Sequence, residues 1–309
     1  MRLKLIAAKK TDVGKQREQN EDNAFERIES LEDGDYGLFI VADGMGGYKA
    51  GEVASQLAVD EMSKALDAFF KPRFDQTTVK LETKDIQTQT RQSDDPDATI
   101  QLSAAAIKDA QKAIEGADDA QKTLILSDSI DVAAREQQLK KAIEQANRAI
   151  VQYGEKQSAA RGLGCTVTAA LVEGDRAYIA NVGDSRTYLW RDKTLKAITR
   201  DHSLVARLVE SKQIEQEDVY THPQRNLIYR SLGAGHKNVE VDTFLEILKP
   251  GDMLLLCSDG LWEMVHDPDL LKVLNEQKDP KQICNELIKL ANKHGGEDNI
   301  TAVVVQVSA

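Results

Sequence analysis

The sequence has few cysteines and no spacing that would join them. Cys165, Cys257 and Cys284 are isolated and lie among apolar residues. Because an odd number of separated cysteines builds neither a disulfide framework nor a Cys-x-x-Cys zinc site, we expect buried thiols in a reducing cytoplasm. The sequence also lacks His-x-x-His and Cys-x5-Arg spacing. Zinc, copper and cysteine-nucleophile chemistry are therefore without support.

Long apolar runs and basic stretches are also missing. No run of about 18 apolar residues occurs, and the start, MRLKLIAAKK, lacks the longer apolar region and cleavage site of a signal peptide. We therefore expect no membrane span. The net charge is −11, which disfavours nucleic acid and anionic membrane surfaces as partners. With 309 residues the chain can form one large domain or two modest ones.

Aromatic residues are absent from Asp75–Gln152, and Asp75–Gln138 contains a single proline and a single glycine. The Thr-, Gln- and Asp-rich part, Asp75–Asp97, is typical of a loop or disordered stretch. Helical periodicity follows, weakly over Ile100–Ala117 and more clearly over Val132–Tyr153. We expect a polar, largely helical segment here, and no motif indicates its role.

The remaining chain alternates between short apolar runs and turn residues, which predicts antiparallel meanders, with amphipathic helices at both ends of the series. These elements predict an α+β fold, in which two packed antiparallel β-sheets form a β-sandwich flanked by helices on both sides, as α-β-β-α layers. The predicted strands are Leu3–Ala8, Tyr36–Ala42, Thr166–Val172, Arg176–Val182, Thr187–Trp190, Leu195–Ile198, Val239–Leu248, Met253–Ser258 and Asn299–Val307. The predicted helices, besides those above, are Gly51–Phe69, Ser203–Ser211, Asp267–Gln277 and Pro280–Lys293.

Three aspartates stand at the ends of apolar strands with glycine neighbours. Asp43 and Asp259 directly follow predicted strands, and Asp298 precedes one by a residue. A single Asp-Gly at a strand end is usually only a turn, but three such strand-end aspartates in one chain, with RxxNED upstream, indicate a shared site. All-oxygen ligands favour Mg²⁺ or Mn²⁺. Two such ions about 3.5–4 Å apart can hold a water that attacks phosphorus in line, without a covalent intermediate.

The segments around these aspartates resemble the metal-dependent serine/threonine protein phosphatase family (type 2C, PPM), in its compact bacterial form. The resemblance spans most of residues 1–70 and 139–309, and its segments occur in the family's order. The matching segments are RxxNED (Arg17–Asp22), VADGMGG, GCTVTAALVEGDRAYIANVGDSRTYLW, TRDHS, HPQRNLIYRSLGA, LLLCSDGLW and GGEDNITAVVV.

The resemblance implies roles for the metal ligands. Asp43 would bridge two ions, Mn²⁺ or Mg²⁺, and the Gly44 carbonyl would complete the first metal site. Asp259 and Asp298 would hold the second ion. A third ion lacks its expected carboxylate, because Ala159 stands where bacterial relatives often have aspartate.

The resemblance also implies roles for the RxxNED segment. Arg17 would bind the substrate phosphate, for which its planar guanidinium suits two phosphate oxygens at once. Glu21 and Asp22 would orient metal-bound waters without ligating the metal. Met45 replaces the histidine that could protonate the leaving group in eukaryotic members, so the general acid stays unassigned.

Several other polar residues favour structural interpretations. Structural or solvent roles are expected for His202 and His222, and a tight hairpin is expected around Asp184 and Arg186. The segment Asp201–Gly235 resembles the family's flap, where substrate choice would lie.

We therefore predict a single phosphatase catalytic domain over residues 1–309, with an atypical insertion at about 75–138. It would hydrolyse phosphoserine and phosphothreonine, counter a bacterial Ser/Thr kinase in the cytoplasm, and act as a monomer on phosphorylated proteins. Two alternatives stay open: a non-catalytic phosphoprotein-binding regulator of the same fold, or a hydrolase of small phosphate esters. The insertion could be a solvated elaboration or a docking site.

Overall fold

The structure is a computed structural model of the chain that describes residues 2–31, 34–46, 50–70, 119–157, 162–277 and 279–309, and the backbone alone for 119–130. The chain divides into two compact units. The main unit comprises Met1–Phe70 and Gln138–Ala309, and the second comprises Lys71–Gln137. The predicted loop Asp75–Asp97 and helix Ile100–Ala117 lie outside the described residues.

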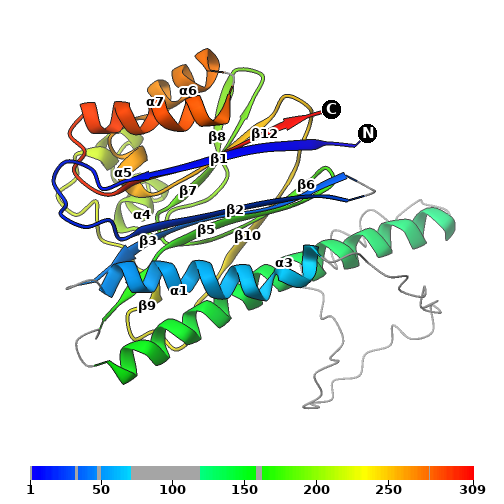
Figure 1. The fold of residues 1–309 in the computed structure, drawn as a ribbon, viewed down its shortest axis with the longest axis horizontal. Helices are drawn as coiled ribbons and strands as arrows, with labels where there is room; N and C mark the ends of the chain where they lie inside the picture. Colours follow the sequence, from blue (N-terminus) through cyan, green and yellow to red (C-terminus); the bar gives the residue numbers. More distant parts are fainter. Residues whose placement is uncertain (1, 32–33, 47–49, 71–118, 158–161, 278) are drawn as a thin grey trace. The chain divides into compact units, whose positions relative to one another are not determined.

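Two antiparallel β-sheets pack face to face in the main unit, as predicted (Figure 1). The first sheet has the order β1 (Lys4–Asp12), β12 (Ile300–Ser308), β11 (Met253–Cys257), β7 (Arg186–Arg191) and β8 (Thr194–Ala197). The second has the order β10 (Asp242–Ile247), β6 (Arg176–Val182), β5 (Val167–Glu173), β3 (Gly34–Met45), β4 (Gly164–Cys165) and β9 (Leu232–Gly233), with β2 (Asp22–Leu31) also paired to β3.

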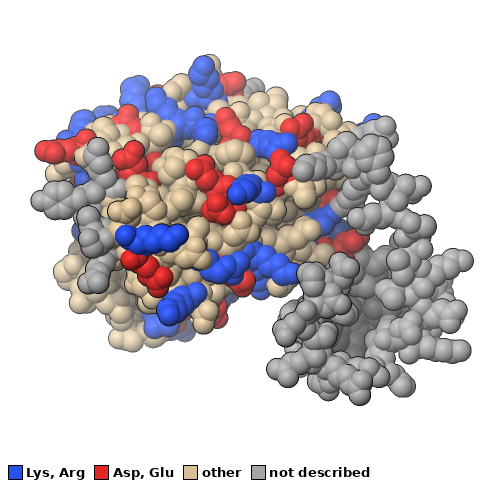
Figure 2. Space-filling view, turned by 60° about the horizontal axis from the view of Figure 1, so that its bottom comes forward, with Lys and Arg blue, Asp and Glu red and all other residues tan. Residues whose placement is uncertain are grey.

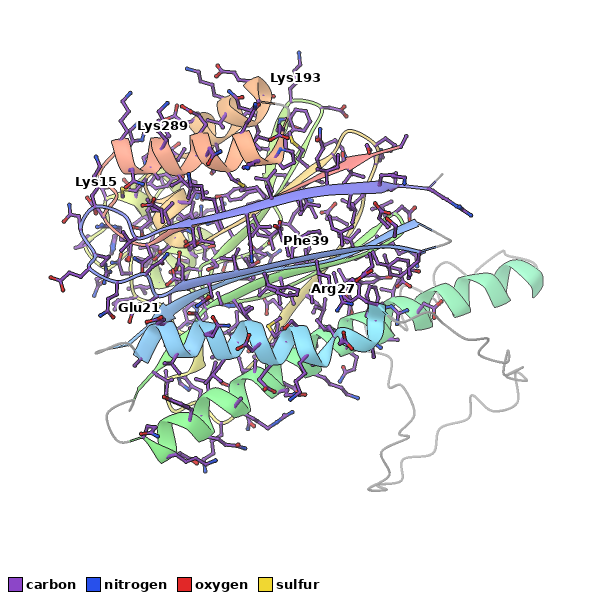
Figure 3. The ribbon with its side chains drawn as sticks, in the orientation of Figure 1. Lys15, Glu21, Arg27, Phe39, Lys193 and Lys289 are labelled. Atoms are coloured by element: carbon purple, nitrogen blue, oxygen red, sulfur yellow. The ribbon has the colours of Figure 1, made fainter. Side chains whose placement is uncertain are left out.

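The alternation of side chains along the strands builds two hydrophobic cores. In β11, Leu254 and Leu256 point between the sheets, whereas Met253 and Leu255 point to the opposite face, beneath helices. Phe39 of β3 lies in the core between the sheets (Figure 3). Central strands such as β12 are covered on both faces, which explains the unbroken apolar run at the end of the sequence.

Helices cover the outer faces of the sandwich, which completes the predicted layers (Figure 1). On the first sheet lie α6 (Asp267–Glu276) and α7 (Pro280–Lys293), and α7 begins at Asp279, whose side chain accepts a hydrogen bond from the Gln282 N–H. On the second sheet lie α1 (Ala50–Ala65), the 3₁₀ turn η1 (Asp67–Phe70) and the second half of α3 (Asp119–Lys156). The helix predicted over Val132–Tyr153 lies within α3 and is confirmed.

The structure differs from the expected elements at a few points. Strand β2 was not predicted, because all but its first residue are half-buried or exposed and no apolar alternation results. Strand β3 runs to Met45 instead of ending at Ala42, because Gly44 and Met45 pair with β4. The flap segment contains α4 (Leu204–Glu210) and η4 (Gln216–Tyr220), and a short helix α5 (Asp259–Trp262) follows β11.

The expectations about cysteines and membrane spans can be compared with the described residues. All three cysteines are buried and unpaired, and burial raises the pKa of each thiol. Within the part of the chain that the structure describes, no helix combines the length and apolarity that crossing a bilayer requires.

Candidate active site

Two of the predicted site residues face each other across a strand pair. Asp22 at the start of β2 is directly opposite Asp43 near the end of β3, so both side chains lie on the same face of the sheet. Asp22 is 5% exposed. Burial and the neighbouring carboxylates Asp298 and Glu21 raise its pKa to about 6. The sheet thus places two acidic groups close together at one edge of the sandwich.

Asp259 joins this pair from the first turn of α5, immediately after β11. The Asp43 and Asp259 carboxyl groups lie within hydrogen-bonding reach of each other. Desolvation and the repulsion from Asp259 raise the pKa of Asp43 well above its usual range. Desolvation and the repulsion from Asp298 raise the pKa of Asp259 to about 6. Carboxylates this close repel one another unless protons or cations neutralise them.

Asp298 lies at the rim of the cluster, just before β12, and binds Arg17. Arg17 Nη2 donates to Asp298 Oδ2 at 2.6 Å, and the side chains are 51% and 32% exposed. The other Asp298 oxygen, Oδ1, accepts a hydrogen bond from the Asn299 N–H at 2.8 Å. In the structure the predicted phosphate-binding arginine therefore pairs with a predicted metal ligand, at a solvent-accessible edge of the cluster.

The Asp22 side chain accepts a hydrogen bond from a protein side chain at the end of β11. Ser258 Oγ donates to Asp22 Oδ2 at 2.7 Å and accepts from the Thr301 N–H at 3.0 Å. Ser258 immediately precedes Asp259. The hydroxyl thus ties Asp22 to the chain segment that carries Asp259.

Glu21 supports the start of α1 (Figure 3). Its carboxylate accepts a hydrogen bond from the Gly51 N–H in the first helical turn, and burial raises its pKa. A Cβ on Gly51 would lie 2.7 Å from the Glu21 carboxyl carbon, so the helix can approach only because residue 51 is glycine. The Glu21 carbonyl also accepts from the Gly44 N–H at 3.2 Å. Glu21 therefore connects α1 to the segment that follows Asp43.

Asn299 organises the RxxNED loop, a role that the sequence analysis did not assign. Its Nδ2 donates to the carbonyls of Val13 and Gln19, both at 2.9 Å, and its Oδ1 accepts from the Glu21 N–H at 2.7 Å. The side chain is buried. The signal was present as the asparagine of GGEDN, but its partners lie about 280 positions away in the chain, and nothing local identifies them.

Two further carboxylates, Asp184 and Glu263, interact with Asp259. Burial and then repulsion from Asp259 raise the pKa of Asp184 well above its usual range. Burial and Asp259 raise the pKa of Glu263 to about 7. Arg225 of the flap binds Glu263 Oε2 at 3.2 Å and Glu297 Oε2 at 3.1 Å. The acidic cluster is thus larger than predicted, and the flap contacts its rim.

Arg186 has a structural role, as predicted for GDSR. It is buried and forms a bidentate ion pair with Asp201, with Nη2 and Oδ2 at 2.7 Å. Its Nη1 donates to the Tyr188 hydroxyl at 2.9 Å, and its guanidinium stacks 3.5 Å from the Trp262 ring centroid. These contacts satisfy the guanidinium within the protein.

The two histidines also have structural contacts. His202 Nδ1 accepts from the Gly183 N–H at 3.0 Å, and burial lowers the pKa of the ring. His222 Nδ1 accepts from the Gln224 N–H at 3.1 Å. Ala159, the position of the missing third-site carboxylate, lies outside the described residues, and Met45 pairs with Gly164 at the end of β3.

The donor set fits hard divalent cations. Asp22 Oδ1 and Asp259 Oδ1 are buried and have no hydrogen-bond partner among the described residues, so two carboxylate oxygens remain available for a cation or its waters. Within the described ranges no three acidic, histidine or cysteine side chains are arranged as a complete metal site, and Asp298 is paired with Arg17. The donor chemistry nevertheless fits a cation, because two carboxylates with raised pKa values and unsatisfied oxygens favour added positive charge.

These pKa values predict a pH dependence of stability in the presence of EDTA. The pKa of Asp22 is higher in the folded chain (about 6) than its ordinary value of 3.8. The folded state therefore binds more protons between these values, and the free energy of unfolding falls as pH rises through about 4 to 6. Asp22 alone would account for about 2 to 3 kcal/mol.

Urea unfolding in EDTA at about pH 5 and about pH 8 measures roughly half of this change, the part that lies above about pH 5. We expect greater stability at the lower pH, and we expect Mn²⁺ to stabilise the protein more at the higher pH, where the carboxylates are ionised. Stability in EDTA that is equal at both values, or greater at the higher one, would contradict the prediction.

The chain is similar to known proteins over most of its length. A family model described as Protein phosphatase 2C matches residues 14–300. The chain is 34% identical over 299 residues to the serine/threonine phosphatase stp of Listeria welshimeri, covering 96% of this chain and 94% of that protein. It is 32% identical over 305 residues to the serine/threonine protein phosphatase PstP of Mycobacterium tuberculosis, covering 99% of this chain and 45% of that protein.

A solved structure extends the comparison to the fold. The catalytic domain of PstP in complex with 2 manganese ions superimposes with a TM-score of 0.69 at 30% identity, over 99% of this chain and 100% of that one. The matched length and the shared sandwich confirm the resemblance inferred from the sequence segments. The chain belongs to the protein phosphatase 2C family.

Proposed function

We propose that this protein is a Mn²⁺- or Mg²⁺-dependent serine/threonine phosphatase that hydrolyses phosphorylated proteins. The observation that carries the proposal is the group of Asp22, Asp43 and Asp259, whose carboxylates are forced together with raised pKa values beside Arg17 and Asp298. The relatives named above, one of them solved with 2 manganese ions, support the same activity.

The predicted ligands are Asp43, Gly44, Asp259 and Asp298. When bound, two hard divalent ions would supply a nucleophilic water and neutralise charge on the phosphate. Asp43 is paired with Asp22 across the strands and interacts with Asp259, so it would contribute to both metal positions. Gly44 has no side chain, and a Cβ there would collide with the Gly51 and Glu21 carbonyl groups. The absence of a side chain thus lets the backbone of residue 44 pack at the site.

Arg17 would bind and orient the substrate phosphate. It lies on the exposed side of the cluster, and its present partner, Asp298, accepts through one oxygen only. An incoming phosphate offers the guanidinium several oxygens, so it competes favourably with this exposed pair. Asp22 and Glu21 would hold waters and the surrounding backbone in position.

The flap supports a polypeptide substrate rather than a small ester alone. Leu227 and Tyr229 are 51% and 38% exposed on this segment, and Arg207 stacks on the Tyr229 ring at 4.0 Å. Arg225 connects the same segment to Glu263 and Glu297 beside the site. Exposed apolar and basic side chains next to a phosphate site suit residues that flank a phosphorylated serine or threonine.

We also propose the domain organisation, partners and location that the sequence predicts. In the sequence, Asp43 precedes the residues of the second unit, and Asp259 and Asp298 follow them, yet all three belong to the main unit. This supports one catalytic domain with an insertion at about 75–138. The free, buried thiols support a cytoplasmic location. Charges of both signs are mixed over the face shown in Figure 2, which supports protein substrates over nucleic acid. A Ser/Thr kinase would supply the substrates, and the protein would act as a monomer.

Assays of the purified protein with an aryl phosphate and a phosphothreonine peptide test the proposal. We expect hydrolysis of both with Mn²⁺ and loss of at least about 100-fold in rate after chelation with EDTA, because the carboxylates alone cannot activate water. Activity that survives chelation would contradict metal dependence. Hydrolysis of the aryl ester alone would favour the small-ester alternative, and peptide binding without hydrolysis would favour the regulator.

A further inference from the structure

A buried asparagine on α3 forms hydrogen bonds with the turn over residues 233–237, at the end of the flap segment. Asn147 is 1% exposed, on a helix face otherwise buried through apolar residues such as Ile143 and Ile150. Its Nδ2 donates to the His236 carbonyl at 3.0 Å and the Lys237 carbonyl at 3.3 Å, and its Oδ1 accepts from the Gly233 N–H at 2.7 Å. One side chain thus satisfies three backbone groups of another segment.

The backbone that Asn147 holds has an unusual conformation. Gly233, Ala234 and Gly235 all have positive φ, and for Ala234 (φ 46) this conformation is uncommon. A Cβ on Gly233 would lie 2.5 Å from Ile150 Cγ2, so helix and turn touch closely there. Strained backbone persists only where surrounding contacts hold it.

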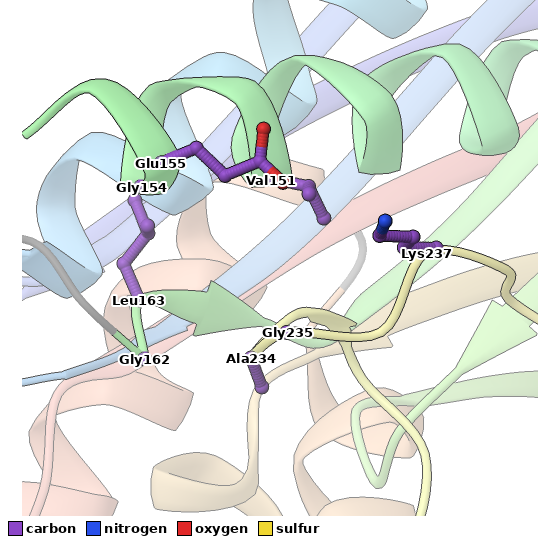
Figure 4. A pocket seen from close by; sticks show the side chains of 8 residues that line it. All are labelled: Val151, Gly154, Glu155, Gly162, Leu163, Ala234, Gly235 and Lys237. Atoms are coloured by element: carbon purple, nitrogen blue, oxygen red, sulfur yellow. The ribbon is translucent and has the colours of Figure 1, made fainter.

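Packing beyond this point of contact is incomplete. A pocket with a volume of about 280 Å³ separates the last turns of α3 from the turn (Figure 4). Its lining is Val151, Gly154, Glu155, Gly162, Leu163, Ala234, Gly235 and Lys237. Hydrogen bonds from Asn147 therefore hold the turn on a side where side-chain packing is sparse.

The turn ends the flap and connects it to the site. Strand β9 returns from the flap and pairs with β4 through Gly164 and Cys165. Cys165 pairs in turn with Gly44 of β3. The Asn147 bond to Gly233 is thus two strand pairings away from the proposed metal ligand Gly44.

We propose that Asn147 is a positioning residue that fixes the returning strand of the flap and thereby sets the affinity for phosphorylated polypeptides; the inference rests on the phosphatase function proposed above. Replacing Asn147 should therefore affect the end of the flap more than the proposed metal ligands. Gly44 is held separately by the Glu21 carbonyl, and the Asp43 carbonyl accepts from the Thr166 N–H at 2.8 Å. Among the described residues, the turn has one other backbone bond to a neighbouring segment outside strand pairing, from the Ala234 N–H to the Leu163 carbonyl at 2.7 Å, whereas Asn147 supplies three.

Asn147→Leu and Asn147→Asp, with Gln145→Ala as matched control, test this proposal. Leucine removes all three bonds at similar volume, and aspartate keeps the acceptor but loses both donations. Gln145 lies on the same helix and donates to Glu61 of α1 at 2.8 Å, away from the flap. We expect both Asn147 variants to raise KM for a phosphothreonine peptide about five- to tenfold, because a buried backbone group loses its partner. KM for an aryl phosphate and the Mn²⁺ concentration for half-maximal activity should stay within about twofold.

Hydrogen exchange gives a readout that does not depend on activity. In the wild-type protein the Gly233 amide should exchange as slowly as strand amides, and in the Asn147 variants the peptide spanning 232–237 should lose protection while Gln145→Ala keeps it. Fast wild-type exchange at Gly233 would overturn the proposal even if no variant folds. The proposal would also be overturned if the Asn147 variants left both the peptide KM and the exchange unchanged. Equal losses of activity on both substrates, in the Asn147 variants and in the control alike, would overturn it as well. Absence of any phosphopeptide hydrolysis by wild type would instead refute the proposed function, and the exchange results would still test the role of Asn147.

Discussion

Replacement of Asp43 by asparagine is expected to lower kcat by about 10³-fold on both an aryl phosphate and a phosphopeptide, because several kcal/mol of charge stabilisation depend on this carboxylate. Burial and then repulsion from Asp259 and Asp22 raise the pKa of Asp43. An amide cannot supply the negative charge that two cations require, although its shape is nearly the same. The variant should therefore fold normally and lose turnover.

Asp298→Asn should cost less, about 10- to 100-fold, and excess Mn²⁺ should restore part of the loss. The Asp298 side chain is 32% exposed, and Arg17 and the Asn299 N–H already share its oxygens. Metal titrations of activity for both variants measure the difference. If both variants lost kcat equally and neither responded to added Mn²⁺, the assignment of Asp43 as the bridging residue would be contradicted.

Asp252→Asn provides a matched control for these substitutions. Asp252 stands at a strand end, like the site aspartates, and is 2% exposed, but it accepts from the Lys249 N–H in a turn and pairs with Arg191. Its replacement should lower stability and leave kcat of the folded protein within about twofold. If Asp43→Asn retained more than about a tenth of wild-type kcat, the two-metal interpretation would be wrong.

The sandwich could be predicted because most strands carry period-2 or unbroken apolar patterns bounded by turns. The pair β5 and β6 is an example, with Glu173 and Arg176 closing a hairpin through Gly174 at φ +59. Strand β2 could not be predicted in this way. Its residues after Asp22 are half-buried or exposed, so neither face has a distinct apolar pattern. Its pairing with β3 is a tertiary outcome that local sequence does not encode.

The site shows the same division between local and distant information. The aspartates could be found because each stands at a strand end close to glycine, a local pattern: Asp43 and Asp259 directly precede one, and Asp298 follows one by two residues. The supporting residues could not, since Ser258 reaches Asp22 across 236 positions and Asn299 reaches Glu21 across 278. Asp184 has the sequence signal of a hairpin residue, yet in the fold its carboxylate interacts with Asp259. A turn residue and a member of the acidic cluster have the same sequence signal.

Arg186→Met is expected to lower the free energy of unfolding by about 3 to 5 kcal/mol, because it leaves a buried carboxylate without its partner. Asp201 is 7% exposed in its side chain and receives three hydrogen bonds from the guanidinium. The arginine also stacks on Trp262 and donates to Tyr188, so methionine would lose these contacts as well. Urea unfolding of wild type and variant measures the loss.

The double variant Arg186→Met, Asp201→Leu separates the two causes of that loss. Removing the carboxylate together with the guanidinium eliminates the uncompensated charge, so we expect recovery of about 2 kcal/mol or more relative to Arg186→Met alone. Arg191→Met, which breaks the more exposed pair with Asp252, is the comparison for an arginine that is 27% exposed in its side chain. A loss below about 1 kcal/mol for Arg186→Met would place this pair among solvent-screened surface interactions and contradict a structural role for GDSR.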